Sequence, residues 1–347
     1  MTTSLHTFRT ELKGLMLNFI WRQWCQMGVS GTTRGHSTGA IDPEVLLAFT
    51  MDIGRHDARM FDAVLDWLVL NGQWINVQRL STIVMRDNVG NAAVAGAIAS
   101  WMGEHDKSAK WRGMSRRMED ARCTPAEALF PSRSERTPAN ADACDPHFAR
   151  YGLLRQPVAS RHTSHSVSMK DASTLFFKSR ALFGIGVRAD VMLYLLLNDG
   201  GHARRIAGLL AYNPMRVQSL LTSLAEAGLA TVHASGRVKH YRIDRTLWKS
   251  ILAGSSTPLP SWIDWRALAR GLTSLWRCAW AIDVHRADDD ISISKTKAAA
   301  RAARDDFYAS GLPLAMDFDK PCAPERFFPA LLHNLDALLA PNTSRIK

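Results

Sequence analysis

The chain has 347 residues, of which 46% are hydrophobic, and it carries a net charge of +11 at pH 7. This length exceeds that of one small binding module and predicts two or three domains, with enough apolar residues for packed cores. The positive charge indicates an acidic partner, most simply nucleic acid. The alternative, that the charge only solvates the protein, is less favoured.

The cysteines and the apolar runs indicate the cellular compartment of the protein. The five cysteines are scattered and form no CxxC pair, which favours a reducing compartment and argues against a disulfide framework or a zinc site. The apolar stretch at 14–21 is too short for a signal peptide, and no run reaches the length of a membrane span. We therefore expect a soluble, cytoplasmic protein with no cofactor and no membrane association.

Residues 1–103 are predicted to form a helical N-terminal domain. An amphipathic helix is expected over 5–27, before a Gly/Ser/Thr-rich loop that lacks the features of a phosphate loop. Asp42, Pro43 and Glu44 form a helix start, with a capping residue, a proline and an early acid. Further helical patterns follow, the last of them rich in alanine. Dimerisation or partner binding is the expected role, and a degenerate helix-turn-helix is the alternative.

Residues 104–172 differ in composition and are predicted to be a partly disordered linker. The first part is basic, and the rest is polar, contains prolines and has few large apolar residues, apart from a short ordered piece near 148–154. Two interpretations of the basic part have equal weight. It adds non-specific phosphate contacts, or it is a solvated face.

Residues 173–250 are predicted to contain three helices followed by a β-hairpin. The first helix carries an apolar stripe and ends at a Gly-Gly pair, and a short second helix covers about 203–210. Asn213 then caps a third helix, which Gly228 ends. Two β-rich runs flank Ser235-Gly236. The residues expected in the core are Val191, Met192, Leu195, Leu196, Ile206, Leu209, Leu210, Val217, Leu220, Leu221, Leu224, Tyr241 and Ile243.

This order of elements is that of a winged helix-turn-helix, and the segment SLAEAGLATVHASGRVKHYRI resembles the DNA-binding domain of the ArsR and MarR families. The resemblance covers about sixty residues. It implies a fold that binds DNA in many proteins and protein partners in others. The stretches LLAFTMDIGRHDARMFDAVLDWLVLNGQWINVQRL and FFKSRALFGIGVRADVMLYLLL also resemble bacterial regulators whose genes neighbour nucleotidyltransferase genes.

In a winged helix, the third helix enters the major groove with its N-terminal part. The candidate reading residues are those of this helix that the core does not need, namely Met215, Arg216, Gln218, Ser219 and Thr222. Arg216 suits the O6 and N7 atoms of guanine, and Gln218 suits the N6 and N7 atoms of adenine. Ser219 and Thr222 are expected to contact phosphates or base edges.

Basic residues on either side of the third helix are expected to contact the DNA backbone. Arg204 and Arg205 begin the second helix, where phosphate contacts position such a domain. Arg237 lies at the tip of the predicted wing, and Lys239 lies on its second strand. From Val187 to Arg245, eight Lys/Arg oppose four Asp/Glu, so this segment is basic by four charges.

Residues 251–347 are predicted to be a C-terminal helical region. It contains a tryptophan-rich helix, a helix of high intrinsic propensity and a last apolar helix. Long helices beside a winged helix often build a dimer interface, so we expect these helices to form a homodimer.

Patterns that could support catalysis or metal binding have structural explanations. His162 and His165 have the spacing of a metal pair, but they lie in the polar linker without carboxylates. Asp288, Asp289 and Asp290 are consecutive and cannot all face one ion, so a solvated loop is favoured. The sequence has no Walker, GxSxG or HExxH motif, and we expect neither an enzyme nor a metal protein.

The sequence thus predicts a mainly α fold, with a helical N-terminal domain, a winged helix-turn-helix with a short β-hairpin, and C-terminal helices. The expected function is that of a sequence-specific transcriptional regulator, a repressor, that binds double-stranded DNA. The alternative is an antitoxin-like or defence-system subunit that binds a partner enzyme and regulates its own operon.

Overall fold

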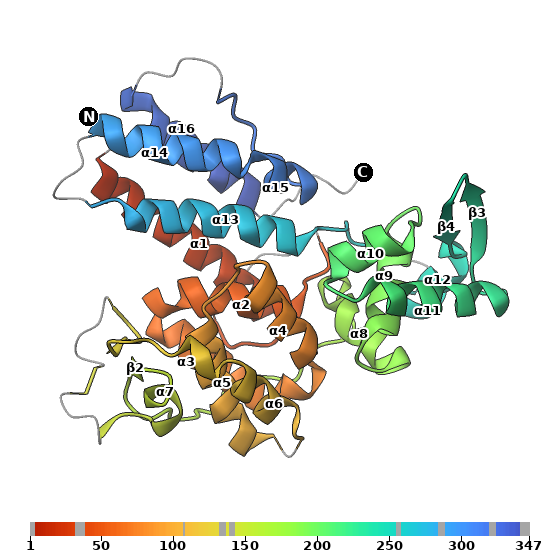
Figure 1. Cartoon of the computed structure of the whole chain (residues 1–347), viewed down its shortest axis with the longest axis horizontal. Coiled ribbons are helices and arrows are strands. Elements are labelled where there is room, and N and C mark those ends of the chain that lie inside the picture. The colour runs from red at the N-terminus through yellow and green to blue at the C-terminus, as the bar shows by residue number, and fades with distance from the viewer. Residues whose placement is uncertain are drawn as a thin grey trace.

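The computed structural model describes residues 4–31, 39–106, 108–131, 137–138, 143–254, 258–283, 289–318 and 324–340. Within these ranges the fold is mainly helical, as the sequence predicts, and the strands pair into two two-stranded sheets. Figure 1 shows the N-terminal helices below, the C-terminal helices above and a part with a β-hairpin to the right. None of the helices in these ranges is long and apolar enough to cross a membrane.

The N-terminal helices begin at residues whose side chains cap them. The Asp42 carboxylate accepts the N–H of Val45 and Pro43 takes the first helical position, which confirms this predicted helix start. The bounds are α1 (Leu5–Gln26), α2 (Pro43–Ile53), α3 (Ala58–Asn71), α4 (Val77–Arg86) and α5 (Ala92–His105), with the short helices η1 (Gly54–His56) and η2 (Gly72–Trp74).

Part of the range predicted to be a linker forms short regular elements. Trp111, Met114 and Phe148 are fully buried, and they anchor these short elements to the N-terminal helices. The prediction missed this order because isolated large side chains produce no periodic pattern. Residues 132–136 and 139–142 lie outside the described ranges. The elements are α6 (Lys110–Arg117), η3 (Glu119–Ala121), β1 (Glu127–Ala128), α7 (Pro146–Ala149), β2 (Leu153–Leu154), which is parallel to β1, and η6 (Ala172–Thr174).

One carboxylate fixes the extended stretch after β2. Asp66 of α3 accepts the Ser160 hydroxyl and the N–H groups of residues 161–164 over 2.6–3.1 Å. Burial alone would raise the pKa of Asp66, but these hydrogen bonds outweigh it and lower the pKa to about 2. The predicted histidine pair lies in this stretch, and no group of side chains in the described ranges could hold a metal ion. Asp288 lies outside those ranges.

The elements from α8 to α12 are called here the hairpin part, and those from α9 onwards share an apolar core of their own. Three helices and a hairpin follow in the predicted order, and all the predicted core residues are buried except Leu209, which is half-buried. The bounds are α8 (Leu175–Phe183), α9 (Val187–Leu197), α10 (Ala203–Leu210), α11 (Pro214–Glu226), β3 (Thr231–Ser235), β4 (Val238–Arg242) and α12 (Arg245–Leu252).

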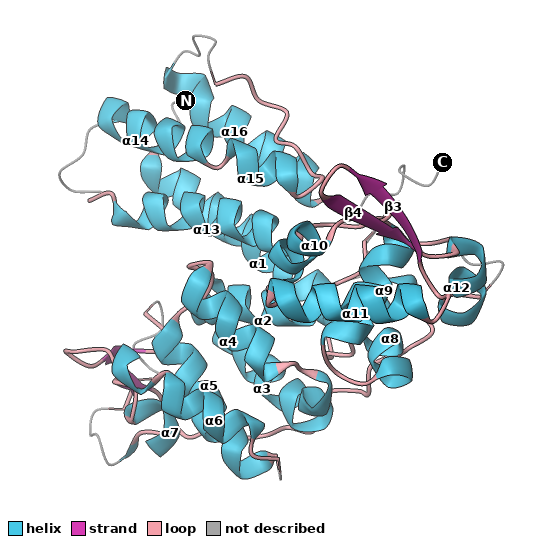
Figure 2. Cartoon of the chain, turned by 45° about the vertical axis from the view of Figure 1, so that its right-hand side comes forward, coloured by secondary structure: helices cyan, strands magenta, loops and turns pink. Residues whose placement is uncertain are grey.

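A backbone bridge ties the antiparallel hairpin to the segment before α10. Gly201 and Tyr241 exchange two hydrogen bonds, at 2.9 and 3.1 Å. The preceding Gly200 has φ +94°, and a Cβ there would lie 2.4 Å from the Tyr241 oxygen, so only glycine fits. The Gly-Gly pair therefore follows the end of α9 and also forms the backbone contact with β4. Figure 2 shows α11 below the hairpin.

The C-terminal helices pack on α1 and α2 and share one core with them. Phe8 stacks on Phe328 with ring centres 4.4 Å apart, and Phe19 stacks on Trp265 at 5.8 Å. The apolar faces expected to form a dimer interface are thus covered by the chain's own N-terminal helices. The bounds are α13 (Trp265–Ala281), α14 (Asp289–Ala302), α15 (Arg304–Ala309) and α16 (Pro324–Leu339).

Candidate nucleic-acid interface

Helix α11 has a buried face and an exposed face. Its four predicted core residues are buried, whereas Met215 is 75% exposed and Arg216 and Ser219 are also exposed. Asn213 caps the helix by accepting the N–H of Met215 at 2.8 Å, as predicted. Three of the five predicted reading residues therefore face outward at the beginning of α11.

The other two predicted reading residues bond to their own fold. Gln218 Nε2 donates to Tyr241 Oη at 2.8 Å and to Thr222 Oγ1 at 3.2 Å. Gln218 and Thr222 are both half-buried, and Tyr241 is the buried residue of β4. Gln218 could read adenine only by giving up these bonds. In this geometry it positions α11 against the hairpin.

The predicted phosphate contacts lie on surfaces that flank α11. Arg204 and Arg205 are exposed in the first turn of α10, Arg237 is exposed between the two strands, and Lys239 is exposed on β4. None of the four forms an ion pair with a residue that the structure describes. Their charges are thus available to a partner from outside.

The exposed surface of this segment is more basic than its composition suggests. From 200 to 243 the chain has six Lys/Arg and one acid. The remaining acids between Val187 and Arg245 are engaged elsewhere. Asp190 is buried, Asp199 pairs with Arg245 at 2.7 Å, and Asp244 caps α12. Unpaired positive charge therefore gathers on α10, the beginning of α11 and the hairpin.

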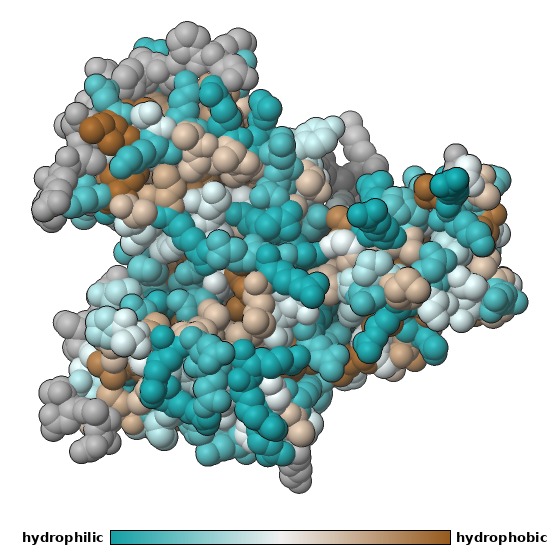
Figure 3. Space-filling model, in the orientation of Figure 1, coloured by the Kyte–Doolittle hydropathy of each residue, from teal (hydrophilic) through white to brown (hydrophobic). Residues whose placement is uncertain are grey.

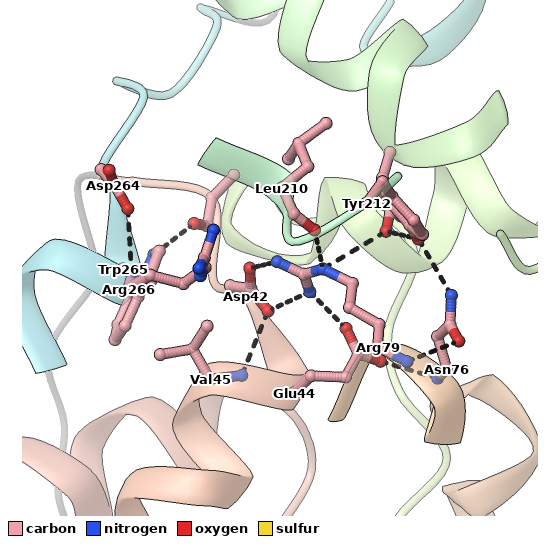
Figure 4. Close-up of polar contacts among 12 residues, drawn as sticks. Asp42, Glu44, Val45, Asn76, Arg79, Leu210, Tyr212, Asp264, Trp265 and Arg266 are labelled. Carbon is pink, nitrogen blue, oxygen red and sulfur yellow. Dashed lines mark hydrogen bonds and ion pairs between the residues drawn. The ribbon is translucent and has the colours of Figure 1, made fainter. Parts of the chain in front are cut away.

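A buried charge cluster that the sequence analysis did not foresee joins the hairpin part to the N-terminal helices. It consists of Arg79, Arg180, Asp42, Glu44 and Asp190, whose side chains are 0–6% exposed. Arg79 of α4 donates to Asp42 at 2.7 Å and to Glu44 at 2.6 Å (Figure 4). Arg180 of α8 donates to both Glu44 oxygens at 2.7 and 2.8 Å, and to both Asp190 oxygens at 3.1 and 3.2 Å.

Two arginines from outside the hairpin part donate hydrogen bonds to carbonyls at the C-terminal end of α10. The last carbonyls of a helix have no partner within it. Arg79 donates to the carbonyl of Leu210 at 2.7 Å (Figure 4). Arg266 of α13 donates to the carbonyl of Gly208. A cation at this end also interacts favourably with the helix dipole. The turn that precedes α11 is therefore held by α4 and α13 together.

The surrounding charges keep the two arginines of the cluster protonated and the neighbouring Tyr212 phenol neutral. Burial alone would lower the pKa of Arg79 and Arg180, but the facing carboxylates outweigh it and raise both values. Tyr212 donates to Asp190 at 2.6 Å and accepts from Asn76 at 2.9 Å. Burial and the charge of Asp190 raise the pKa of Tyr212 well above its ordinary value, so the phenol remains a neutral donor.

The sequence contained a partial signal for this cluster. Asp190 directly precedes the apolar stripe of its helix, and Arg180 lies among the apolar residues of FFKSRALF. A charge on a buried helix face requires a partner. The pattern does not identify that partner, because Glu44 and Arg180 are 136 residues apart.

Comparison with known proteins gives no further guide. No family model, no curated protein and no solved structure matches the chain. The function has to follow from the geometry of the chain itself.

Proposed function

We propose that the chain is a sequence-specific DNA-binding transcriptional regulator, a repressor, in which α9 to β4 form a winged helix. The observation that carries the proposal is the exposed basic surface around the beginning of α11. In a winged helix these positions face the duplex. The basic residues of this surface are Arg204, Arg205, Arg216, Arg237 and Lys239.

The order and pairing of the elements support the winged-helix interpretation. Three helices precede an antiparallel hairpin, and the Gly201–Tyr241 bridge gives β4 a further backbone partner between the first two helices. The bond from Gln218 to Tyr241 fixes the angle between the reading helix and the hairpin. Both surfaces can then meet one duplex without rearrangement.

The proposed contacts divide into those that read bases and those that hold phosphates. Arg216 would read guanine, with Met215 against a thymine methyl group and Ser219 at a base edge or phosphate. Arg204 and Arg205 would hold the backbone beside α11, and Arg237 and Lys239 the backbone near the hairpin. One winged helix offers limited area, so we propose that a homodimer reads two half-sites. Its interface would be a surface other than the apolar faces of the C-terminal helices, which α1 and α2 cover.

The experiment that tests this function selects binding sites from a pool of random duplexes with the full-length protein. Wild type and Arg216→Ala are then titrated against the selected duplex and a scrambled one over a salt series. We expect Arg216→Ala to reduce discrimination at one base pair by about 1–3 kcal/mol. Arg326→Ala is the matched control, since Arg326 is exposed on α16, outside the basic surface. Equal affinity of wild type for both duplexes would contradict the proposal.

Exposed apolar side chains favour the second candidate, a subunit that binds a protein partner. Of the twelve large hydrophobic residues that are exposed in the described ranges, eight lie between Leu182 and Ile251. Figure 3 shows hydrophobic residues among hydrophilic ones at the end of the molecule that carries β3 and β4. Leu247 and Ile251 lie one turn apart on α12, with exposed fractions of 50% and 47%. Failure of the selection, together with loss of a co-purifying protein in Leu247→Ser/Ile251→Ser, would support this candidate.

A further inference from the structure

A groove runs beside α11, on the side away from the hairpin. Its walls are α11 and the turn between α8 and α9, the beginning of α4 contributes to its lining, and its volume is about 630 Å³. Figure 2 shows both α4 and α8 below α11. Arg216, Ser219 and Ser223 line the groove from α11, and Arg188 lines it from α9.

The charge of this groove has one sign. Arg188 and Arg216 come from different helices, and neither forms an ion pair with a residue that the structure describes. None of the described residues that line the groove carries a carboxylate. Tyr212 and Asn76 also line the groove, and they bond to each other and to the buried charge cluster. Two unpaired arginines therefore line a groove in which Tyr212 and Asn76 are held in place by hydrogen bonds.

The turn opposite α11 leaves room for a bound group. Gly184 and Gly186 have φ of +78° and +149°, and a Cβ built on either would have no atom within 4 Å. These glycines therefore adopt backbone angles that other residues avoid, and they leave the space in front of them open. Helix α9 follows directly, and no side chain caps its first turn. This turn also carries Asp190, whose charge is paired with Arg180, so the positive potential in the groove comes from its two arginines.

We infer that this groove binds a phosphate-bearing ligand between Arg188 and Arg216, with Ser219 and Ser223 as hydrogen-bonding groups. Its volume lies in the range of small-molecule sites and exceeds the need of one phosphate. The phosphate can belong to a free nucleotide-like molecule or to the backbone of a bound duplex. The second source rests on the proposed function. Because Arg216 belongs to both sites, a free ligand in the groove would weaken base reading, and DNA would weaken the ligand equally.

The first test measures binding of inorganic pyrophosphate and of ATP to the full-length protein by calorimetry, without DNA. We expect saturable binding of at least one probe by wild type, and at least tenfold weaker binding by Arg188→Gln and by Arg216→Gln. Arg326→Gln is the matched control, because Arg326 is exposed on α16, outside both the groove and the basic surface. Thermal unfolding of each variant checks that the fold is intact. Probe binding that neither groove substitution weakens would overturn the inference.

The second test separates the two sources of phosphate. Wild type and Arg188→Gln are titrated with a 30-base-pair duplex over a salt series. If neither probe binds but Arg188→Gln lowers the salt slope by about 0.9, the groove holds a backbone phosphate. If neither probe binds and Arg188→Gln leaves duplex binding unchanged, the groove inference fails while the regulator proposal stands. If a probe binds through both arginines and no duplex is preferred, the groove stands and the regulator proposal fails.

Discussion

Replacement of Arg180 by methionine removes half of the positive charge from the buried charge cluster. Arg180 makes five hydrogen bonds of 2.7–3.2 Å, four of them to Glu44 and Asp190 and one to the carbonyl of Trp74. Methionine fills much of the same space but donates none of them. Three carboxylates then face the single guanidinium of Arg79, inside a site from which water is excluded.

Breaking a buried ion pair by removal of one partner costs about 3–5 kcal/mol, because the remaining charge stays buried without compensation. Unfolding entropy is about 2.1 cal/mol/K per residue. For a chain of 347 residues that unfolds as one unit, the expected fall in the midpoint of thermal unfolding is therefore roughly 4–7 °C.

Calorimetric and urea unfolding of wild type and Arg180→Met measure this difference. Arg245→Met is the matched control, because Arg245 also pairs with an aspartate, Asp199, but on the surface, with exposed fractions of 45% and 87%. An exposed pair contributes about 0–1 kcal/mol. If Arg180→Met costs no more than this control, the cluster does not hold the hairpin part on the N-terminal helices, and the reasoning is refuted.

Three further predictions concern pH, positioning and salt. Burial lowers the pKa of His56 to about 4, so the stability that the neutral imidazole contributes is complete above pH 6.5 and is lost as the pH falls towards 4. In urea unfolding, the free energy of unfolding of wild type should fall by on the order of 2 kcal/mol between pH 7 and pH 5, and that of His56→Gln should fall by less. Gln218→Ala removes the bond to Tyr241, so it should lower the free energy of unfolding by about 1 kcal/mol and weaken binding to all duplexes alike. A loss of affinity confined to sites with one particular adenine would show instead that Gln218 reads that base. The exposed face of α6 is tested by the triple variant Arg112→Gln/Arg116→Gln/Arg117→Gln. If these arginines contact phosphates, the variant should lower the salt slope of duplex binding by up to about 2.7. An unchanged slope would show that this face is only solvated.

Local patterns were sufficient to place the elements of the hairpin part. Asn213 caps α11, Gly228 has φ +70° just after its end, and Gly236 lies in the turn of the hairpin, directly after Ser235 ends β3. Each of these signals acts within one or two turns of chain, through a cap, a backbone angle or an alternation of faces. The exposure of Arg216 and Ser219 followed from the same periodicity, because residues that the core does not need face outward.

The partners of the side chains were decided only by the tertiary structure. The periodic pattern of α11 leaves Gln218 outside the core, but its amide meets Tyr241 because β4 folds back beside the helix. The same limit applies to the buried charge cluster and to the C-terminal helices, whose apolar faces meet α1 rather than a second copy of the chain. A pattern reports which residues avoid water. It does not report which distant surface excludes that water, because this depends on how separate helices pack.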